Sequence, residues 1–310
     1  MGRKRKRSKN QMDGVLILNK PSGPTSAACL NTIRRELDQG RIGHGGTLDP
    51  MAQGVLIVLL GHGTKFAPYL TSGEKTYQGQ LRLGQTTDTY DAEGTIVEEK
   101  TFDHLSPEQV QEAVLDWMNQ TTQEVPPVSA AKFQGKPLYA LVREGKEVPV
   151  KIRDMKISHA EILELDLPWV RFRVTCSAGT YVRSLVHSLG IRLGSGAVLT
   201  ELIRENCHPF SLEDAYDMDS LIKEPEKLAD RVIPLAKALP HWPSLVLTEE
   251  QSAQVKNGTW LPVSEVAADE TATQTGQHAL LVGHDGTPLA LVESAKRNDK
   301  LLWSILRGLW

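Results

Sequence analysis

The sequence predicts an α+β protein that ends in a small β-rich domain, and three features of its 310 residues support this. Apolar or alternating stretches typical of strands recur between residues 14 and 176. Segments with a helical spacing of apolar residues separate them. After Pro240 the pattern changes to short strand-like pieces around a hairpin signal. A chain of this length suits roughly two domains, each with a real core.

The composition is that of an ordinary soluble protein, with 40% apolar and 24% charged residues. No apolar run approaches the ~20 residues of a membrane span, so no membrane contact is expected. The three cysteines lie far apart, which disfavours disulfides and a zinc ribbon and fits a reducing, cytoplasmic location. The nine histidines are equally scattered, and the sequence therefore predicts no metal site.

Charge is concentrated at the N-terminus. Residues 3–9 contain six basic side chains and no acid, so the rest of the chain carries −9 of the total charge of −3. This stretch is not a signal peptide, because the apolar run that follows at 15–18 is too short. We expect residues 1–11 to form a disordered basic tail that either binds nucleic acid or is merely solvated.

The first elements are a strand, a turn and a helix. Residues 14–20 are short and apolar enough for a strand, and 21–24 contain the prolines and glycine of a turn. Thr25 or Ser26 then caps a helix. The apolar residues of this helix follow helical spacing at Ala27, Leu30, Ile33 and Leu37.

Residues 41–60 hold a single carboxylate, Asp49, between a glycine-rich turn at 43–46 and an apolar run at 55–60. Glycine and proline around an acid let the backbone bend sharply. The apolar run is typical of a buried strand. A carboxylate at the mouth of such a strand either caps the turn or is placed for chemistry, and the local pattern leaves both open.

The next strand is predicted at 75–83, where Tyr77 lies on the apolar face of a strict alternation. A polar loop follows at 84–94. Ser106 and Gln109 form a capping box with proline at the first helical position, which predicts a helix from residue 107.

Two further strands are predicted at 160–167 and 169–176, before a turn and a helix. Tyr181 and Arg183 lie in the first turn of that helix, where their side chains can face a partner across a cleft. A second helix is predicted at 198–204.

Between 126 and 153 the chain is loop-rich and basic. Residues 130–175 contain nine basic and six acidic side chains, in contrast to the acidic remainder. Aromatic residues interleaved with bases suit stacking on unpaired nucleotides together with phosphate contact. The alternative is a solvated hairpin without a ligand.

The C-terminal part predicts a helix at 248–256, a short strand at 260–263 and a mobile polar loop at 267–277. Strands at 279–282 and 288–292 flank a His-Asp-Gly hairpin signal. Residues 301–306 are expected to close a small β-barrel.

Several chemistries are disfavoured by missing motifs. The sequence has neither the Gly-x-Ser-x-Gly of a hydrolase nor a Gly-x-Gly-x-x-Gly that opens a helix after a strand. A paired-carboxylate glycosidase stays open on spacing alone. The best-supported site is cofactor-free and contains Asp49, Tyr77, Tyr181 and Arg183 beside RNA-binding features.

Five collinear segments between Gly14 and Asn206 resemble the TruB family of tRNA pseudouridine synthases. They are GHGGTLDPMAQGV at 43–55, NKPSGPTS at 19–26, KTY at 75–77, LGQTTD at 83–88 and SAGTYVR at 177–183. The resemblance implies a pseudouridine synthase fold, a mixed and mainly antiparallel sheet flanked by helices. It assigns 12–240 to the catalytic domain, with 130–153 as an RNA-gripping insertion. Residues 241–310 are similar to a PUA-like RNA-binding domain.

The resemblance further implies isomerisation of uridine-55 in the tRNA T loop, after base flipping and without a cofactor. Asp49 is the implied nucleophile, and its target, C6 of the base or C1′ of the sugar, stays open. Arg183 would pair with Asp49, and Tyr181 would support both by hydrogen bonding. Tyr77 would stack on the flipped base and is a candidate to remove the C5 proton.

The implied substrate-binding residues come from several segments. Leu202 would line the pocket, His44 would stack in the RNA loop, and Lys20 would support the strand ends or contact phosphate. The other positions in this group are Gly46, Thr47, Asp88, Lys132 and Arg143.

The chain departs from the family at two places. Gly45 stands where many members have threonine, and the aromatic residue before Ser129 is missing from 126–132. The expected partner is the T arm of tRNA, bound by a monomer with no obligate protein partner. The alternative function is an RNA-binding protein or tRNA chaperone that acts without turnover.

Overall fold

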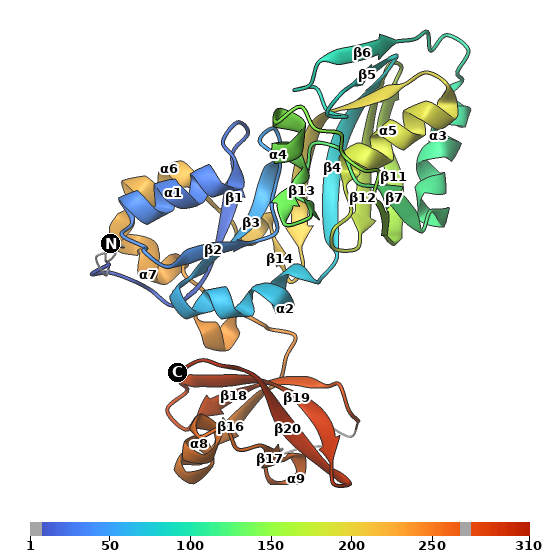
Figure 1. Ribbon diagram of the computed structural model, residues 1–310. Helices are drawn as coiled ribbons and strands as arrows, with labels where there is room; N and C mark the ends of the chain where they lie inside the picture. Colours follow the sequence, from blue (N-terminus) through green and yellow to red (C-terminus); the bar gives the residue numbers. More distant parts are fainter. Residues whose placement is uncertain (1–7, 267–273) are drawn as a thin grey trace.

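The computed structural model describes residues 8–266 and 274–310 and shows an α+β protein (Figure 1). Residues 1–7 of the predicted basic tail and 267–273 of the predicted mobile loop lie outside the described residues. Residues 8–11 are described, and the backbone N–H of Lys9 donates to Asp38 at 2.8 Å. Within the described ranges, no helix is long and apolar enough to cross a membrane.

The largest sheet among the described residues has nine strands, seven of them in the order β11-β12-β4-β13-β3-β1-β15. β14 pairs with β13, and β2 pairs with β3. Its parallel pairs are β1–β15 and β3–β13, and the others are antiparallel, which confirms the mixed, mainly antiparallel sheet. The strands are β1 (Gly14–Lys20), β2 (Ile42–Gly45), β3 (Gln53–Leu60), β4 (Lys75–Leu83), β11 (Ile157–Asp166), β12 (Trp169–Cys176), β13 (Ala197–Cys207), β14 (Phe210–Ser211) and β15 (Tyr216–Asp217).

Three helices cover one face of this sheet: α1 (Ser26–Glu36), α3 (Pro107–Leu115) and α5 (Val182–Leu193). The predicted caps are confirmed. The Thr25 side chain accepts a hydrogen bond from the Ala28 N–H, and Ser106 forms its capping box with Gln109. The buried stripes of these helices and the inward residues of the strands form one continuous core.

The opposite face of β1 and β3 is covered by a different set of elements. A 3-10 helix (Gly61–Phe66) and α2 (Ala67–Thr71) contribute Phe66 and Leu70 to a second core. The C-terminal domain adds Leu280 and Leu309 to the same cluster. Apolar side chains on both sides explain why β3 reads as an unbroken apolar run instead of an alternation.

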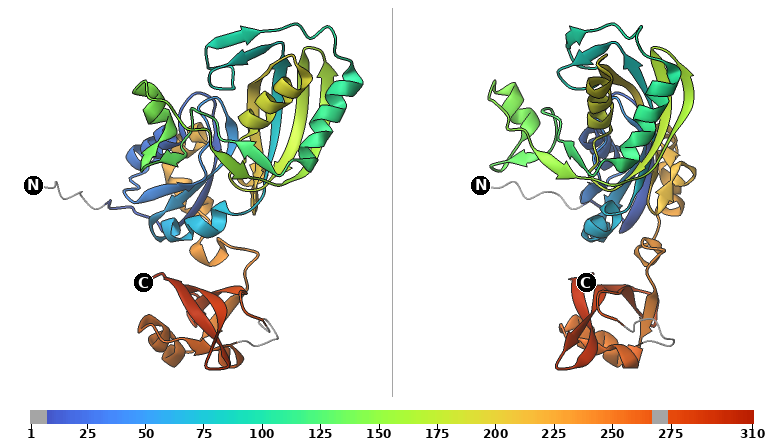
Figure 2. Two further views of the ribbon diagram at one scale, coloured as in Figure 1. Left: turned by 45° about the vertical axis from the view of Figure 1, so that its right-hand side comes forward. Right: turned by 90° about the vertical axis from the view of Figure 1, so that its right-hand side faces the viewer.

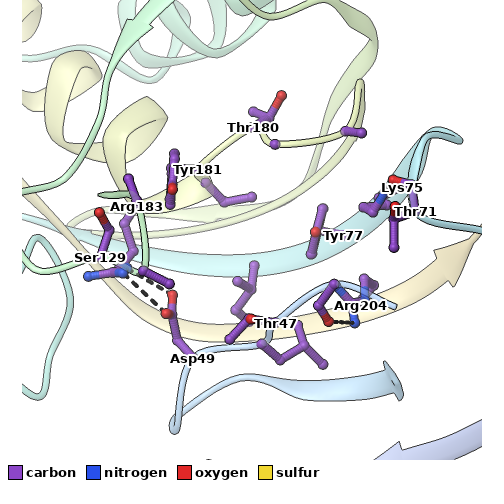
Figure 3. Close-up of a pocket in the computed structure, with 18 of the residues that line it drawn as sticks. Thr47, Asp49, Thr71, Lys75, Tyr77, Ser129, Thr180, Tyr181, Arg183 and Arg204 are labelled. Atoms are coloured by element: carbon purple, nitrogen blue, oxygen red, sulfur yellow. Dashed lines mark hydrogen bonds and ion pairs between the residues drawn. The ribbon is translucent and has the colours of Figure 1, made fainter. Parts of the chain in front are cut away.

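The two halves of the sheet meet at a narrow junction between β3 and β13. These strands pair through Gln53–Gly54 and Ile203–Arg204. Gly54 has φ +99°, and a Cβ there would lie 2.3 Å from the Arg204 carbonyl oxygen, so only glycine permits this approach. The loop that carries Asp49 directly precedes this pairing and lines the pocket beside it (Figure 3).

The predicted helix at 198–204 is wrong, because these residues belong to β13. Its register against β4 shifts at two points, between Leu199 and Glu201 and between Arg204 and Asn206. A bulge adds one residue to the alternation. Apolar residues at 198, 199, 202 and 203 therefore imitate helical spacing, while pairing with β4 determines the strand.

Smaller elements surround the sheet. The predicted polar loop at 84–94 begins with β5, which pairs with β6, and β7 pairs with β10 at the base of the insertion. Figure 2 shows α4, within the insertion, projecting from the body. These elements are β5 (Gln85–Thr87), β6 (Ile96–Glu99), β7 (Thr122–Glu124), β8 (Lys132–Phe133), β9 (Lys136–Pro137), α4 (Leu138–Arg143), β10 (Ile152–Asp154), α6 (Met218–Lys223) and α7 (Leu228–Arg231).

The C-terminal domain is a curled five-stranded sheet in the order β16-β18-β19-β20-β17, with its own core (Figures 1 and 2). The predicted hairpin around Asp285 and Gly286 joins β18 to β19. The elements are β16 (Ser244–Leu247), α8 (Glu249–Lys256), β17 (Leu261–Pro262), α9 (Val263–Val266), β18 (His278–Gly283), β19 (Pro288–Arg297) and β20 (Lys300–Gly308).

Candidate active site

A pocket lies on the helical face of the sheet, where β4 and β13 approach the N-terminus of α5 and the loop after β2 (Figure 3). Seven of the predicted site residues line it: Gly46, Thr47, Asp49, Tyr77, Tyr181, Arg183 and Leu202. The other lining residues are Leu48, Thr71, Ser72, Lys75, Ser129, Ala130, Ala131, Arg153, Ala178, Gly179, Thr180, Val182 and Arg204.

The loop that carries Asp49 is held on both sides. The Ser26 hydroxyl accepts from Leu48 N–H at 2.9 Å and lies 3.0 Å from the Leu48 carbonyl oxygen, to which it donates. Lys20 is fully buried, and its ammonium donates to the carbonyls of Pro21, Pro50 and Ala52 at 2.7–3.0 Å. All three of its N–H donors are thus used on carbonyls within the protein.

Asp49 faces Arg183 directly (Figure 3). Nη2 of Arg183 donates to Oδ1 at 3.1 Å, and Nε lies 2.9 Å from Oδ2. The arginine side chain is 5% exposed, whereas that of Asp49 is 34% exposed. The carboxylate is therefore fixed by a buried cation and still open to the pocket, as a nucleophile requires.

Arg183 is itself held from the other side. Its Nη1 donates to the Thr89 carbonyl at 2.8 Å and lies 3.3 Å from Oδ2 of Asp91, and Nη2 also donates to the Val128 carbonyl. Burial raises the pKa of Asp91, and a hydrogen bond from Thr89 and the charge of Arg183 oppose that rise. Asp91 was missed by the sequence analysis, which selected Asp88.

Tyr77 forms the floor of the pocket on β4 and is 7% exposed. Burial raises the pKa of its phenol to about 12, and the neighbouring Arg204 only partly opposes this. Arg204 is also buried and was missed: it donates from Nε to the Val55 carbonyl at 2.7 Å and from Nη2 to the Gly46 carbonyl. It connects β13 to β3 and to the loop that leads to Asp49.

The predicted hydrogen bonds from Tyr181 to Asp49 and Arg183 are not present among the residues that the structure describes. Tyr181 is the N-cap of α5, two positions before Arg183, and side chains two positions apart leave a helix in different directions. Tyr181 still lines the pocket, and its backbone N–H donates to Gln123 at 3.0 Å.

Besides Lys20, four predicted binding residues lie outside the pocket lining. His44 is half-buried on β2, where burial, with the charge of Arg204, lowers the pKa of its imidazole. Asp88 is exposed and accepts from the Thr95 N–H at 2.8 Å. Lys132 and Arg143 are exposed on the insertion. These residues remain predicted contacts to a ligand larger than the pocket.

The site offers one oriented carboxylate, an aromatic floor and an apolar side chain, Leu202, for a planar group. Within residues 8–266 and 274–310, no three His, Cys, Asp or Glu side chains gather as metal ligands would. The arrangement suits nucleophilic attack on a base or sugar held between Tyr77 and Asp49.

Comparisons with known proteins agree with this site. Residues 34–182 match the family model described as TruB family pseudouridylate synthase (N terminal domain). The chain is 52% identical over 301 residues to tRNA pseudouridine synthase B of Nitratidesulfovibrio vulgaris strain Miyazaki F, covering 97% of each protein. It is 56% identical to the protein of the same name from Oleidesulfovibrio alaskensis, again over 301 residues and 97% of each.

Solved structures support the fold. An archaeal box H/ACA ribonucleoprotein complex contains a chain that superposes with a TM-score of 0.71 at 24% identity, covering 99% of this chain and 89% of that one. A box H/ACA particle bound to a substrate RNA gives the same TM-score at 23% identity, covering 99% and 88%. At such identities the likeness concerns the fold alone.

Proposed function

The chain belongs to the TruB family of pseudouridylate synthases, and we propose that it isomerises uridine-55 in the T loop of tRNA to pseudouridine, with Asp49 as the nucleophile. Relatives of high identity over nearly their whole length carry the name tRNA pseudouridine synthase B. The observation that carries the proposal is the Asp49–Arg183 pair in a pocket floored by Tyr77.

In the proposed reaction the uridine leaves its stack and enters the pocket, where Tyr77 and Leu202 contact the planar base. Asp49 attacks C6 or C1′, the N1–C1′ bond breaks, the base rotates, and C5 bonds to C1′. The carboxylate leaves again, and the proton lost from C5 is balanced by one gained at N1. Nothing is added to the nucleotide, so these steps require no redox or group-transfer partner.

Arg183 has two roles in this scheme. Its guanidinium pairs with both oxygens of the Asp49 carboxylate, and its contacts with Asp91, Thr89 and Val128 hold the guanidinium still. The carboxylate is thereby oriented before the substrate arrives.

Tyr77 is better suited to stacking than to accepting the C5 proton. With a pKa of about 12, only about one phenol in 10⁵ is ionised at pH 7. A neutral phenol is a very weak base, whereas its ring stacks equally well in either state.

Substitution of the nucleophile tests the proposal. We expect Asp49→Asn to abolish pseudouridine formation in a T-arm stem-loop while largely sparing RNA binding, with carbodiimide labelling and primer extension as the readout. Asp230→Asn is the matched control, since it removes an exposed carboxylate that has no predicted role and does not line the pocket. Normal turnover by Asp49→Asn contradicts the assignment, and a wild-type protein that binds the stem-loop without turnover supports the tRNA chaperone alternative.

We further propose that residues 12–240 form the catalytic domain, that 130–153 grip the RNA, and that 241–310 form a PUA-like RNA-binding domain. The separate core of the C-terminal sheet and the exposed basic side chains of the insertion support this division.

We also propose a cytoplasmic monomer that needs no obligate protein partner. Sedimentation of the protein with and without T-arm RNA tests the oligomeric state.

A further inference from the structure

The pocket is lined by four cationic side chains, and three of them are already committed within the protein. Arg183 contacts two carboxylates and two carbonyls, as described above. Arg204 donates to the carbonyls of Val55 and Gly46. Lys75 is 5% exposed and donates to the carbonyls of Thr71 and Gly73, both at 2.8 Å.

The side chain of the fourth cation, Arg153, makes no hydrogen bond or ion pair with any residue in the described ranges. It is exposed and lines the same pocket as Asp49. An arginine carries five N–H donors in a planar fork that matches the oxygens of a phosphate group. Arg153 thus keeps its full binding capacity at the rim of a site whose substrate is a polyanion.

The position of Arg153 is set by regular structure. It lies on β10, opposite Gln123 of β7, at the base of the insertion. Gln123 is buried, and its side chain accepts from the Tyr181 N–H and donates to the Gly179 carbonyl. The strand that holds Arg153 is therefore tied to the turn that leads into α5.

Gly179 makes room for the guanidinium. A Cβ at this position would lie 2.4 Å from both Cζ and Nη2 of Arg153, so the guanidinium rests directly against the glycine backbone. Gly179 also has φ +85°, a conformation that favours glycine.

A second polar group that lines the pocket also lacks a partner. The Ser129 hydroxyl is buried and makes no hydrogen bond to the residues that the structure describes. Buried hydroxyls are normally satisfied, so the pocket is suited to a polar ligand.

We propose that Arg153 binds a phosphate flanking the flipped nucleotide, and that position 179 is glycine so that the guanidinium can lie beside the pocket. This inference rests on the proposed function, since it takes RNA as the ligand. It goes beyond that function because it assigns a phosphate subsite within the pocket itself, separate from the exposed bases farther out on the insertion.

The first experiment compares Arg153→Gln with Lys156→Gln. Both remove one exposed positive charge from the same segment, but Lys156 does not line the pocket. For a T-arm stem-loop we expect Arg153→Gln to raise Kd and KM about tenfold, with a smaller change in kcat. The slope of log K against log salt should fall by about one unit. Equal behaviour of the two variants overturns the proposal.

The second experiment locates the phosphate. A neutral methylphosphonate is placed at the 5′ or the 3′ linkage of the target uridine, and binding is measured for the wild type and Arg153→Gln. We expect one linkage to cost the wild type about tenfold and the variant almost nothing, since its guanidinium is already absent. A wild type indifferent to both substitutions contradicts the assignment.

The third experiment is a double-mutant cycle with Gly179→Ala. Alanine strains the backbone in any background, but it displaces the guanidinium only where Arg153 is present. We expect Gly179→Ala to weaken RNA binding several-fold more in the wild type than in Arg153→Gln, with equal losses of Tm in both. Equal losses of binding reject the role given to Gly179. If the wild type makes no pseudouridine, the proposed function fails, while the phosphate subsite is still judged by these binding results.

Discussion

The cations around Asp49 and those on the insertion differ in what surrounds them. Arg183, Arg204 and Lys20 are buried and donate to carbonyls or carboxylates of the protein. Lys132 and Arg143 are exposed and face solvent. Buried, paired cations hold a reactive group in place, whereas exposed ones attract a polyanion. The first group should therefore govern the rate, and the second the salt-dependent affinity.

The largest expected effect is that of Arg183→Ala. It leaves the buried Asp91 carboxylate without its partner, which lowers the free energy of unfolding by about 3–5 kcal/mol for a buried pair, and it removes the group that orients Asp49. We expect kcat to fall by about 10²- to 10³-fold, with RNA affinity little changed. Arg192→Ala on the same helix is the control, because its pair with Asp116 is exposed. If Arg183→Ala weakened RNA binding without lowering kcat, Arg183 would act like the exposed cations, and the prediction would be contradicted.

The next effect concerns Tyr77, which is buried beside the buried cations but is itself uncharged. Because burial raises its pKa to about 12, a phenolate base would make kcat rise about tenfold per pH unit between pH 7 and 9. We expect no such rise, since stacking does not depend on ionisation. Single-turnover rates across this range decide between the two roles, and Tyr77→Phe, which keeps the ring, should still bind RNA.

A smaller effect is expected on the insertion. Replacing Lys132 and Arg143 together with glutamine should weaken T-arm binding several-fold at low salt and reduce the salt slope by about one to two units. Lys146→Gln is the matched control, because the charge of Lys146 is already paired with Glu144. If the double variant lost kcat but kept its affinity, the exposed cations would affect the rate, and the proposed difference between the two groups of cations would be wrong.

The smallest effect is expected from deleting residues 2–7, which spares the contact between Lys9 and Asp38. If the basic tail attracts RNA, the deletion should lower affinity a few-fold at low salt and hardly at all at physiological salt. Titrations at two salt concentrations test this. An unchanged salt dependence would mean that the tail is merely solvated.

The local sequence pattern predicted the secondary structure correctly where local interactions determine it. The alternation at 75–83 matches β4, and the capping box at Ser106 opens α3. It failed at β13, where two bulges disturb the alternation and pairing with β4 overrides it.

The same limit applies to the site. Asp49 and Arg183 were found through motifs, whereas Asp91, Arg204 and Arg153 act through contacts made by distant segments. Of these three, Asp91 was the easiest to predict from the sequence, because it lies three residues after Asp88 in the same polar loop. No local pattern indicated that a buried arginine on β13 would hold the Asp49 loop.

The shared core beneath β1 and β3 bears on how this protein can be shortened. Leu280 and Leu309 of the C-terminal domain pack in one cluster with Val15 and Ile17, and Lys65 donates to the Gly308 carbonyl at 2.7 Å. A chain truncated after residue 240 would expose apolar side chains of β1 and β3 to water. The C-terminal sheet is thus also a structural support for these strands, and its loss would require a new cover for that surface.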